Sequence, residues 1–159
     1  MGGALVLIGC GVQEVEAVRT AKLSGFHTIV IDRDPRAAGF ALADEAVVLD
    51  GKDIEGITAW VLLNRDRFDI RGIWTSVNLT TTVAAVASAC ALPGIPVATA
   101  VAAQNKVLMK RLMVQHGIPT PRFVEVATLD EARAALGDLG GAAFLKSVDS
   151  FGGQGCGAV

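Results

Sequence analysis

The C-terminal stretch 144–159 carries the residues whose types and spacing best suit a chemical role. An apolar run ends at Lys146, and a segment rich in serine and glycine follows it. A lysine supplies a point charge, and glycines let backbone N–H groups approach oxygen atoms without an intervening Cβ. This pattern suits a polyphosphate, with candidate residues Ser150, Gly152, Gly153 and Gly155. The lysine precedes the glycines, so the segment is not a Walker A loop. A flexible glycine tail is the alternative.

A second candidate site lies near the N-terminus, where Gly9-Cys10-Gly11 follows an apolar run. Asp32 comes about twenty positions later, which is the spacing found in dinucleotide-binding loops. The third glycine of such loops is replaced here by Glu14. Two glycines still permit close backbone approach to a ligand at a helix N-terminus, while a tight strand–helix turn explains them equally well. The candidate ligand-binding residues are Gly11, Gln13 and Asp32.

A third candidate site is the polar segment 75–78, which follows an apolar strand-like run. Open α/β sheets bind ligands at the carboxyl ends of their strands. The short polar side chains that could hold a polar or carboxylate substrate are Thr75, Ser76 and Asn78. These residues suit N-caps of the following helix at least as well.

These candidates need a scaffold of alternating strands and helices, and residues 1 to about 100 predict one. Continuous apolar runs, expected of strands buried on both faces of a parallel sheet, occur at 4–8, 28–31, 46–49 and 72–74. Helical periodicity separates them, and a short last strand is expected within 92–97. The fold class is therefore α/β, with a Rossmann-like doubly wound parallel sheet.

The character of the chain changes near residue 102. An amphipathic helix at 105–113, a proline-stiffened connector at 118–121 and a strand at 123–126 are expected. Thr128 and Glu131 form a predicted capping box, and a strand at 142–145 presents Lys146. We expect three parts, which are 1–101, a linker helix and connector at 102–121, and the start of an α+β lobe at 122–159.

Composition excludes several classes of protein. The chain has 159 residues, of which 52% are hydrophobic, and a net charge of −2, so neither nucleic acid nor an acidic membrane is an expected partner. The uncharged stretch 72–105 is interrupted by prolines and is expected to be buried rather than to span a membrane. Three cysteines without C-x-x-C spacing favour a reducing cytoplasm over a disulfide or zinc framework.

Taken together, the segments resemble the ATP-grasp superfamily, in particular its carbamoyl-phosphate-synthase-like and biotin-carboxylase-like branch. The likeness extends over essentially the whole chain and rests on the order and spacing of several motifs. The motifs are Gly9-Cys10-Gly11-Val12-Gln13, Ile31-Asp32-Arg33-Asp34-Pro35, Gly39-Phe40-Ala41-Leu42-Ala43-Asp44-Glu45, Asn105-Lys106-x-x-Met109-Lys110, Gly117-Ile118-Pro119-Thr120-Pro121 and Lys146-Ser147-Val148-Asp149-Ser150-x-Gly152-Gly153.

The resemblance implies a pre-ATP-grasp domain followed by the beginning of an ATP-grasp domain. It implies that Lys106 and Lys146 contact ATP phosphates and that the loop 150–157 folds over the triphosphate. The first domain is implied to help form the acceptor-substrate pocket. Such enzymes use Mg-ATP to activate a carboxylate as an acyl phosphate, which an amine or another nucleophile then attacks.

Two departures from the family pattern stand out. Ser147 replaces the proline that usually follows the second lysine, and the family continues well beyond residue 159. The resemblance therefore places the Mg²⁺ ligands beyond residue 159, and Asp149 is a lone carboxylate near the loop. We expect no catalytic residue and no metal ligand within the chain, which is interpreted as a truncated N-terminal portion, inactive alone, of an ATP-dependent carboxylate–amine ligase.

Two other hypotheses remain open on the sequence. One is a stand-alone Rossmann-type module that binds a nucleotide or another small ligand and depends on Asp32. The other is a structural role in which the sheet domain mediates dimerisation. The expected partners are small-molecule carboxylate and amine substrates, and a homodimer is a further option.

Overall fold

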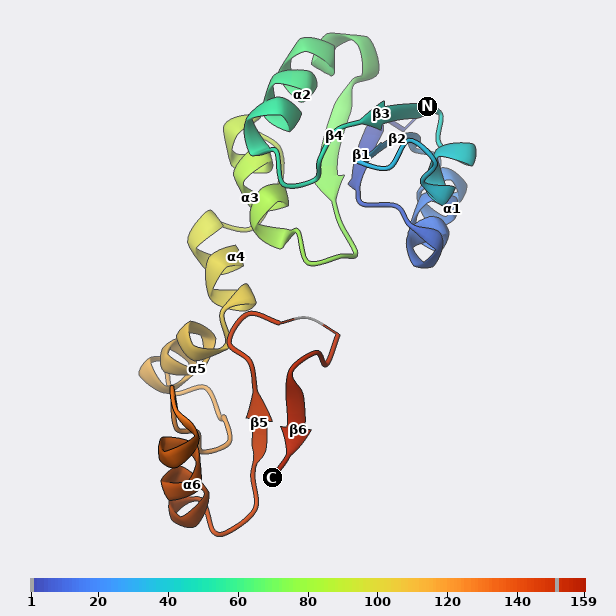
Figure 1. The fold of residues 1–159 in the computed structure, drawn as a ribbon. Helices are drawn as coiled ribbons and strands as arrows, with labels where there is room; N and C mark the ends of the chain where they lie inside the picture. The colour runs from blue at the N-terminus through green and yellow to red at the C-terminus, as the bar shows by residue number, and fades with distance from the viewer. Residues whose placement is uncertain (1, 151) are drawn as a thin grey trace. The chain divides into compact units, whose positions relative to one another are not determined.

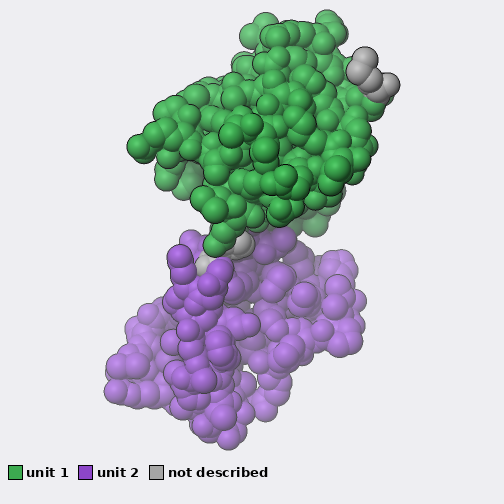
Figure 2. Space-filling model, turned by 90° about the vertical axis from the view of Figure 1, so that its right-hand side faces the viewer, with its two compact units in different colours: residues 1–100 green, residues 101–159 purple. Residues whose placement is uncertain are grey.

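The computed structural model describes residues 2–150 and 152–159. They form two compact units, one ending at Ala100 and one beginning at Val101 (Figure 2). The elements of the first unit are β1 (Ala4–Ile8), η1 (Val12–Glu14), α1 (Val15–Leu23), β2 (His27–Asp32), η2 (Ala38–Ala41), β3 (Glu45–Val48), α2 (Ile54–Phe68), β4 (Ile70–Trp74) and α3 (Thr80–Ala89). The remaining elements are α4 (Val97–Gln104), which crosses the division, α5 (Lys106–Gln115), α6 (Leu129–Asp138), β5 (Phe144–Lys146) and β6 (Cys156–Ala158).

The first unit is built on a four-stranded sheet with the strand order β3-β2-β1-β4 (Figure 1). All three strand pairs are parallel, with Val6 opposite Ile29 on one side and Ile73 on the other. β2 lies on one side of β1 and β4 on the other, so the strand order reverses beside β1. This reversal is the topological switch point at which open α/β sheets bind their ligands.

The two central strands, β1 and β2, are buried on both faces of the sheet, and alternate side chains of each strand point to opposite faces. One face packs Ile8 and Ile31 against Ile57 of α2 and Val86 of α3. The other face packs side chains of the intervening strand positions, such as Val30, against α1. The predicted doubly wound parallel sheet is therefore confirmed.

Local signals in the sequence explain several helix ends. Asp53 caps α2 by accepting a hydrogen bond from the Gly56 amide, as predicted. Thr128 and Glu131 form the predicted capping box at the start of α6. Gly25 follows α1 with a φ of 84°, a conformation that glycine adopts without strain.

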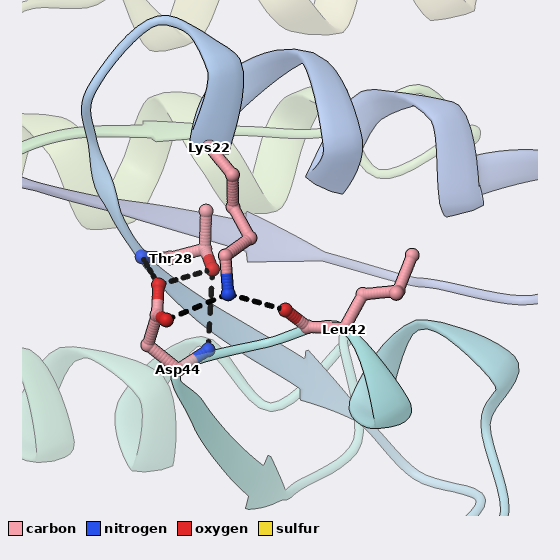
Figure 3. Close-up of polar contacts among 4 residues, drawn as sticks. All are labelled: Lys22, Thr28, Leu42 and Asp44. Atoms are coloured by element: carbon pink, nitrogen blue, oxygen red, sulfur yellow. Dashed lines mark hydrogen bonds and ion pairs between the residues drawn. The ribbon is translucent and has the colours of Figure 1, made fainter.

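A polar cluster fastens the segment before β3 to the start of β2 (Figure 3). Oδ2 of Asp44 accepts hydrogen bonds from the Thr28 amide at 2.9 Å and from the Thr28 hydroxyl at 2.8 Å. Lys22 of α1 donates to Oδ1 of Asp44 at 2.7 Å and to the Leu42 carbonyl at 2.8 Å. The Lys22 hydrogen bond is the largest cause that lowers the pKa of Asp44 to about 2. The cluster satisfies the buried Thr28 hydroxyl and sets the position of the η2 segment.

Two predicted strands are absent from the structure. The segment 92–97 forms no strand, and Val97 instead begins α4, with the Pro96 carbonyl accepting from the Ala100 amide at 3.1 Å. Pro93 and Pro96 have no N–H to contribute to a ladder, which explains the wrong prediction. The segment 123–126 has the expected apolar residues but pairs with no strand. Periodicity alone cannot supply a pairing partner.

The second unit combines the end of α4, α5 and α6 with a small hairpin. β5 pairs antiparallel with β6, with Leu145 opposite Gly157. The segment that was predicted as a strand is held by side chains instead, because Arg111 of α5 binds both carboxylate oxygens of Glu125 at 2.6 and 2.5 Å. Among the described residues, no helix is long and apolar enough to cross a membrane.

Candidate functional site

The loops after β1 and β4 lie at the carboxyl edge of the sheet, beside the switch point. Gly11 is the N-cap residue of η1, and Gln13 lies within η1. Gln13 and Ser76 are exposed, and so is Asn78, which has a polar partner of its own. The sheet thus brings the predicted residues after β1 and after β4 to one edge.

Asp32, the last residue of β2, directs its carboxylate at the backbone of two neighbouring loops. The Cys10 amide donates a hydrogen bond to Oδ2 of Asp32 at 2.7 Å. The Asp34 amide donates to Oδ1 at 2.9 Å. Both carboxylate oxygens are therefore engaged by backbone N–H groups of the protein itself.

Thr75, which follows β4, is placed in a similar way. Its hydroxyl donates to the carbonyl of Ile8, the last residue of β1, at 2.8 Å. The same hydroxyl oxygen accepts from the Val77 amide at 3.2 Å. The end of β1 and the loop after it are therefore hydrogen-bonded to the last residue of β2 and to the segment after β4.

Cys10 lies within this loop and is only 1% exposed. A Cβ on Gly39 would lie 1.9 Å from the Cys10 sulfur, so only glycine fits against the thiol. Burial is the largest cause that raises the pKa of Cys10 to about 11, and the charges of Glu14 and Asp32 add to the increase. A thiol with a pKa this high is almost entirely protonated at neutral pH and is a poor nucleophile.

The second unit contains a cavity of about 900 Å³ beside β5. Lys106, at the start of α5, and Lys146, at the end of β5, both line this cavity. Its walls are largely apolar and include Val107, Phe123, Val124, Leu129, Leu136, Phe144 and Leu145. Two of the residues predicted to bind ATP thus reach one cavity from elements forty residues apart in the chain.

Lys106 also connects α5 to the segment that begins the glycine-rich loop. Its amide donates to the Val148 carbonyl at 2.9 Å, and its ammonium group donates to the Ser150 carbonyl at 2.7 Å. Asn105 caps α5 by accepting from the Leu108 amide at 2.9 Å, which sets the position of the neighbouring lysine.

The predicted glycine-rich segment connects β5 to β6 as a hairpin loop. The Ser147 amide donates to the Gly155 carbonyl at 3.1 Å and so closes the base of the loop. Gly152, Gly153 and Gly155 all have positive φ values, between 63° and 78°. These conformations favour glycine, which explains the composition of the loop without reference to a ligand.

One buried atom of this loop suits a phosphate ligand. The Ser150 hydroxyl oxygen is buried and has no hydrogen-bond partner among the described residues. A buried hydroxyl without a partner is energetically unfavourable, and a phosphate oxygen would supply an acceptor. The residues that line the cavity include Lys106 and Lys146 but not Ser150, Gly152, Gly153 or Gly155, so the cavity does not bring all of the predicted ATP-binding residues together. The described residues contain no cluster of three or more His, Cys, Asp or Glu side chains that could hold a metal ion.

Lys110 is the last residue of the motif that begins at Asn105, and it is not among the residues predicted to bind ATP. It lies one helical turn after Lys106 on α5 and also lines the cavity, and its ammonium group contacts the Thr120 hydroxyl. The spacing of four residues between the two lysines places them on one face of a helix and was the available signal.

The fold and these residues define an α/β protein with a switch-point loop site and a lysine-lined cavity. No family profile matches the chain. It is 30% identical over 153 residues to a formate-dependent phosphoribosylglycinamide formyltransferase of Paraburkholderia xenovorans, covering 95% of this chain and 37% of that protein. An enzyme of the same description from Burkholderia mallei is 29% identical. The chain thus spans less than half the length of these curated relatives.

Solved structures show the same fold. N5-carboxyaminoimidazole ribonucleotide synthetase of Thermotoga maritima superposes with a TM-score of 0.75 at 22% identity, covering 99% of this chain and 41% of that one. The biotin carboxylase domain of Hydrogenobacter thermophilus 2-oxoglutarate carboxylase, in complex with MgADP and bicarbonate, gives a TM-score of 0.72 at 18% identity. It covers 99% of this chain and 38% of that structure. The chain is an ATP-grasp homologue that corresponds to the N-terminal portion of these longer proteins, as the sequence motifs indicated.

Proposed function

We propose that the chain forms the acceptor-side domain and the first phosphate-binding elements of an ATP-grasp ligase. In this proposal the second unit binds the phosphates of ATP through Lys106, Lys146 and the Ser150 hydroxyl, with backbone amides of Gly152, Gly153 and Gly155. The first unit contributes to the acceptor pocket at its switch point, through Gly11, Gln13, Ser76 and Asn78. ATP supplies the phosphoryl group that activates a carboxylate for attack by an amine.

The observation that carries the proposal is the shared cavity of Lys106 and Lys146. Two ammonium groups beside an apolar wall can neutralise a polyphosphate while the wall packs against a base. ADP complexes of structural neighbours support the use of an adenine nucleotide by proteins of this fold. The MgADP complex of one structural neighbour supports the use of Mg²⁺ as well, and we propose, as the family resemblance implies, that the Mg²⁺ ligands lie outside this chain.

The stand-alone dinucleotide module is the weaker alternative. That reading needs a free Asp32 carboxylate to accept the hydroxyl groups of a ribose. Both oxygens of Asp32 already accept backbone amides at 2.7 and 2.9 Å. The protein backbone therefore already uses this carboxylate, which gives Asp32 a structural role that does not depend on a ribose.

Titration of the labelled chain with Mg-ATP, followed by NMR and calorimetry, tests the proposal. We expect binding in the millimolar range, because much of the relatives' length is absent, with shift changes centred on Lys106 and Lys146. Lys146→Ala and Lys106→Ala are each expected to weaken binding about tenfold, which corresponds to the loss of one charged hydrogen bond.

Lys52→Ala is the matched control, because Lys52 is an exposed lysine of the first unit. It should leave ATP binding unchanged. NAD binding that is indifferent to Lys146, or ATP binding that Lys52→Ala weakens as much as Lys146→Ala does, would contradict the proposal.

A further inference from the structure

The end of β1 and the loop after it are held from both sides by side chains at the carboxyl ends of the neighbouring strands. From β2, Asp32 accepts the Cys10 amide, and from the β4 side, Thr75 donates to the Ile8 carbonyl. Backbone hydrogen bonds hold the same segment in place, and one of them joins the Gly9 amide to the Ile31 carbonyl at 2.9 Å. The Gly39 amide donates to the Cys10 carbonyl at 3.0 Å. Both backbone polar groups of Cys10 are thus engaged.

Steric contacts restrict the loop further. Gly9 has a φ of 77°, and a Cβ there would lie 2.8 Å from a methyl group of Val77. Gly39 packs directly on the Cys10 sulfur. The loop after β1 therefore has tight packing and directed hydrogen bonds on each side, while its outer residues Gly11 and Gln13 remain exposed.

We propose that Asp32 is a positioning residue that holds the Cys10–Gly11 backbone in the conformation that exposes Gly11 and Gln13 to a ligand, and that Asp32 does not itself bind the ligand. Its carboxylate joins the β1 loop to the β2 loop through the Cys10 and Asp34 amides. Ionised carboxylates form stronger hydrogen bonds to amides than neutral groups do. The charge of Asp32 therefore stabilises the backbone conformation at Cys10 and Asp34. This assignment rests on the proposed function only for the identity of the ligand. The labelling and exchange measurements that test the positioning role of Asp32 need no ligand.

The assignment explains why an acidic residue ends β2 although the third glycine of a dinucleotide loop is absent. Glu14 stands at that glycine position, with a carboxylate oxygen 3.0 Å from where a Cβ of Gly11 would be. A carboxylate this close to the loop disfavours an approaching pyrophosphate. The Asp32 spacing is then explained by the geometry of adjacent parallel strands rather than by ribose recognition.

The Cys10 thiol and amide report on this contact directly. In a Cys156→Ser background, the two remaining thiols, Cys10 and Cys90, are both buried. We expect Asp32→Ala to increase the rate of Cys10 modification by Ellman's reagent, located by mass spectrometry, about tenfold through local opening. Amide hydrogen exchange at Cys10 and Asp34 should accelerate by a similar factor. Asp32→Asn keeps one acceptor oxygen and should fall between wild type and Asp32→Ala.

Asp50→Ala is the matched control, because the Asp50 carboxylate accepts a single amide, that of Lys52, in the loop after β3. It should leave the Cys10 labelling rate and amide exchange unchanged. Unchanged exchange at Cys10 in Asp32→Ala would overturn the proposal, as would NAD binding that Asp32→Ala abolishes without altering Cys10 exchange. If Asp32→Ala does not fold, Asp32→Asn decides in the same way, and wild-type exchange at both amides in that variant overturns the proposal.

Discussion

The two units of the chain differ most in how they use apolar side chains. In the first unit, strand residues such as Val6, Ile29 and Ile31 are completely buried between helices on both faces of the sheet. In the second unit, the described residues that are buried and apolar are only Ala102 and Ala135. Phe144 and Leu145 of β5 are 59% and 46% exposed. The first unit therefore has a core of its own, and the second has little.

Polar contacts do most to organise the second unit. The capping box of α6, the bidentate Arg111–Glu125 pair and the β5–β6 hairpin define its local structure. Exposed pairs and caps each contribute on the order of 1 kcal/mol or less, whereas a fully buried isoleucine contributes about 2 kcal/mol or more. The comparison teaches that an apolar sequence pattern stabilises a unit only where a second layer covers it.

The largest expected effect comes from removing core volume in each unit. Ile31→Ala deletes a fully buried side chain that packs in the main core, and should lower the free energy of unfolding by about 3 kcal/mol. Leu145→Ala, at a half-exposed position of β5, should lower it by less than about 0.5 kcal/mol. Urea unfolding of both variants measures this difference. Equal losses would show that the second unit has a comparable core.

A pair of glycine substitutions gives a smaller contrast. Gly39→Ala places a methyl group 1.9 Å from the Cys10 sulfur and should destabilise the first unit by about 2 kcal/mol through overpacking. Gly153→Ala meets no atom within 4 Å and imposes only the strain of a φ of 78°, about 1 kcal/mol, within the hairpin loop.

Thermal unfolding and residue-resolved hydrogen exchange separate the two glycine variants. Gly39→Ala should lower the melting temperature of the first unit, and Gly153→Ala should accelerate exchange only in the β5–β6 hairpin. A melting temperature of the first unit that falls in Gly153→Ala would contradict the contrast.

The smallest predicted effect is a pH dependence confined to the first unit. The pKa of Asp44 in the folded protein is about 2, below its usual value of 3.8. Asp44 therefore stabilises the fold above about pH 4, and this contribution is lost as the pH falls towards 2. Because the Asp44 side chain is still 30% exposed and solvent screens its charge, we expect at most about 1 kcal/mol, which Asp44→Asn should remove at neutral pH.

Urea unfolding between pH 2 and pH 7 measures this contribution as the difference between wild type and Asp44→Asn. The difference should shrink as the pH falls. Asp130→Asn in α6, whose partner Arg133 is also exposed, is the control and should leave the unfolding midpoint unchanged. A difference between wild type and Asp44→Asn that grows towards low pH would have the wrong sign.

Local sequence features correctly predicted the strands of the first unit and the helix caps, which depend on signals within a few residues. The apolar runs of the first unit became β1, β2, β3 and β4, and Asp53 and Thr128 cap the helices that they were predicted to cap. The strand prediction failed at 92–97, where Pro93 and Pro96 have no N–H for a ladder and Val97 begins α4. It failed at 123–126 because no partner strand was available. β6 was not predicted, because Cys156–Ala158 has no strong pattern and exists through its pairing with β5.

The sequence by itself determined the α/β class, the ATP-grasp resemblance and the residue types available for phosphate binding, because periodicity, caps and motif order are properties of the chain alone. Only the tertiary structure decided that Lys106 and Lys146 line one cavity, and that both oxygens of Asp32 are engaged by the Cys10 and Asp34 amides. Contacts between residues far apart in the chain depend on how strands pair and which faces are covered. No local pattern encodes that arrangement. Asp32 was therefore predicted to bind a ligand, whereas its contacts in the structure lead us to propose that it positions the loop after β1.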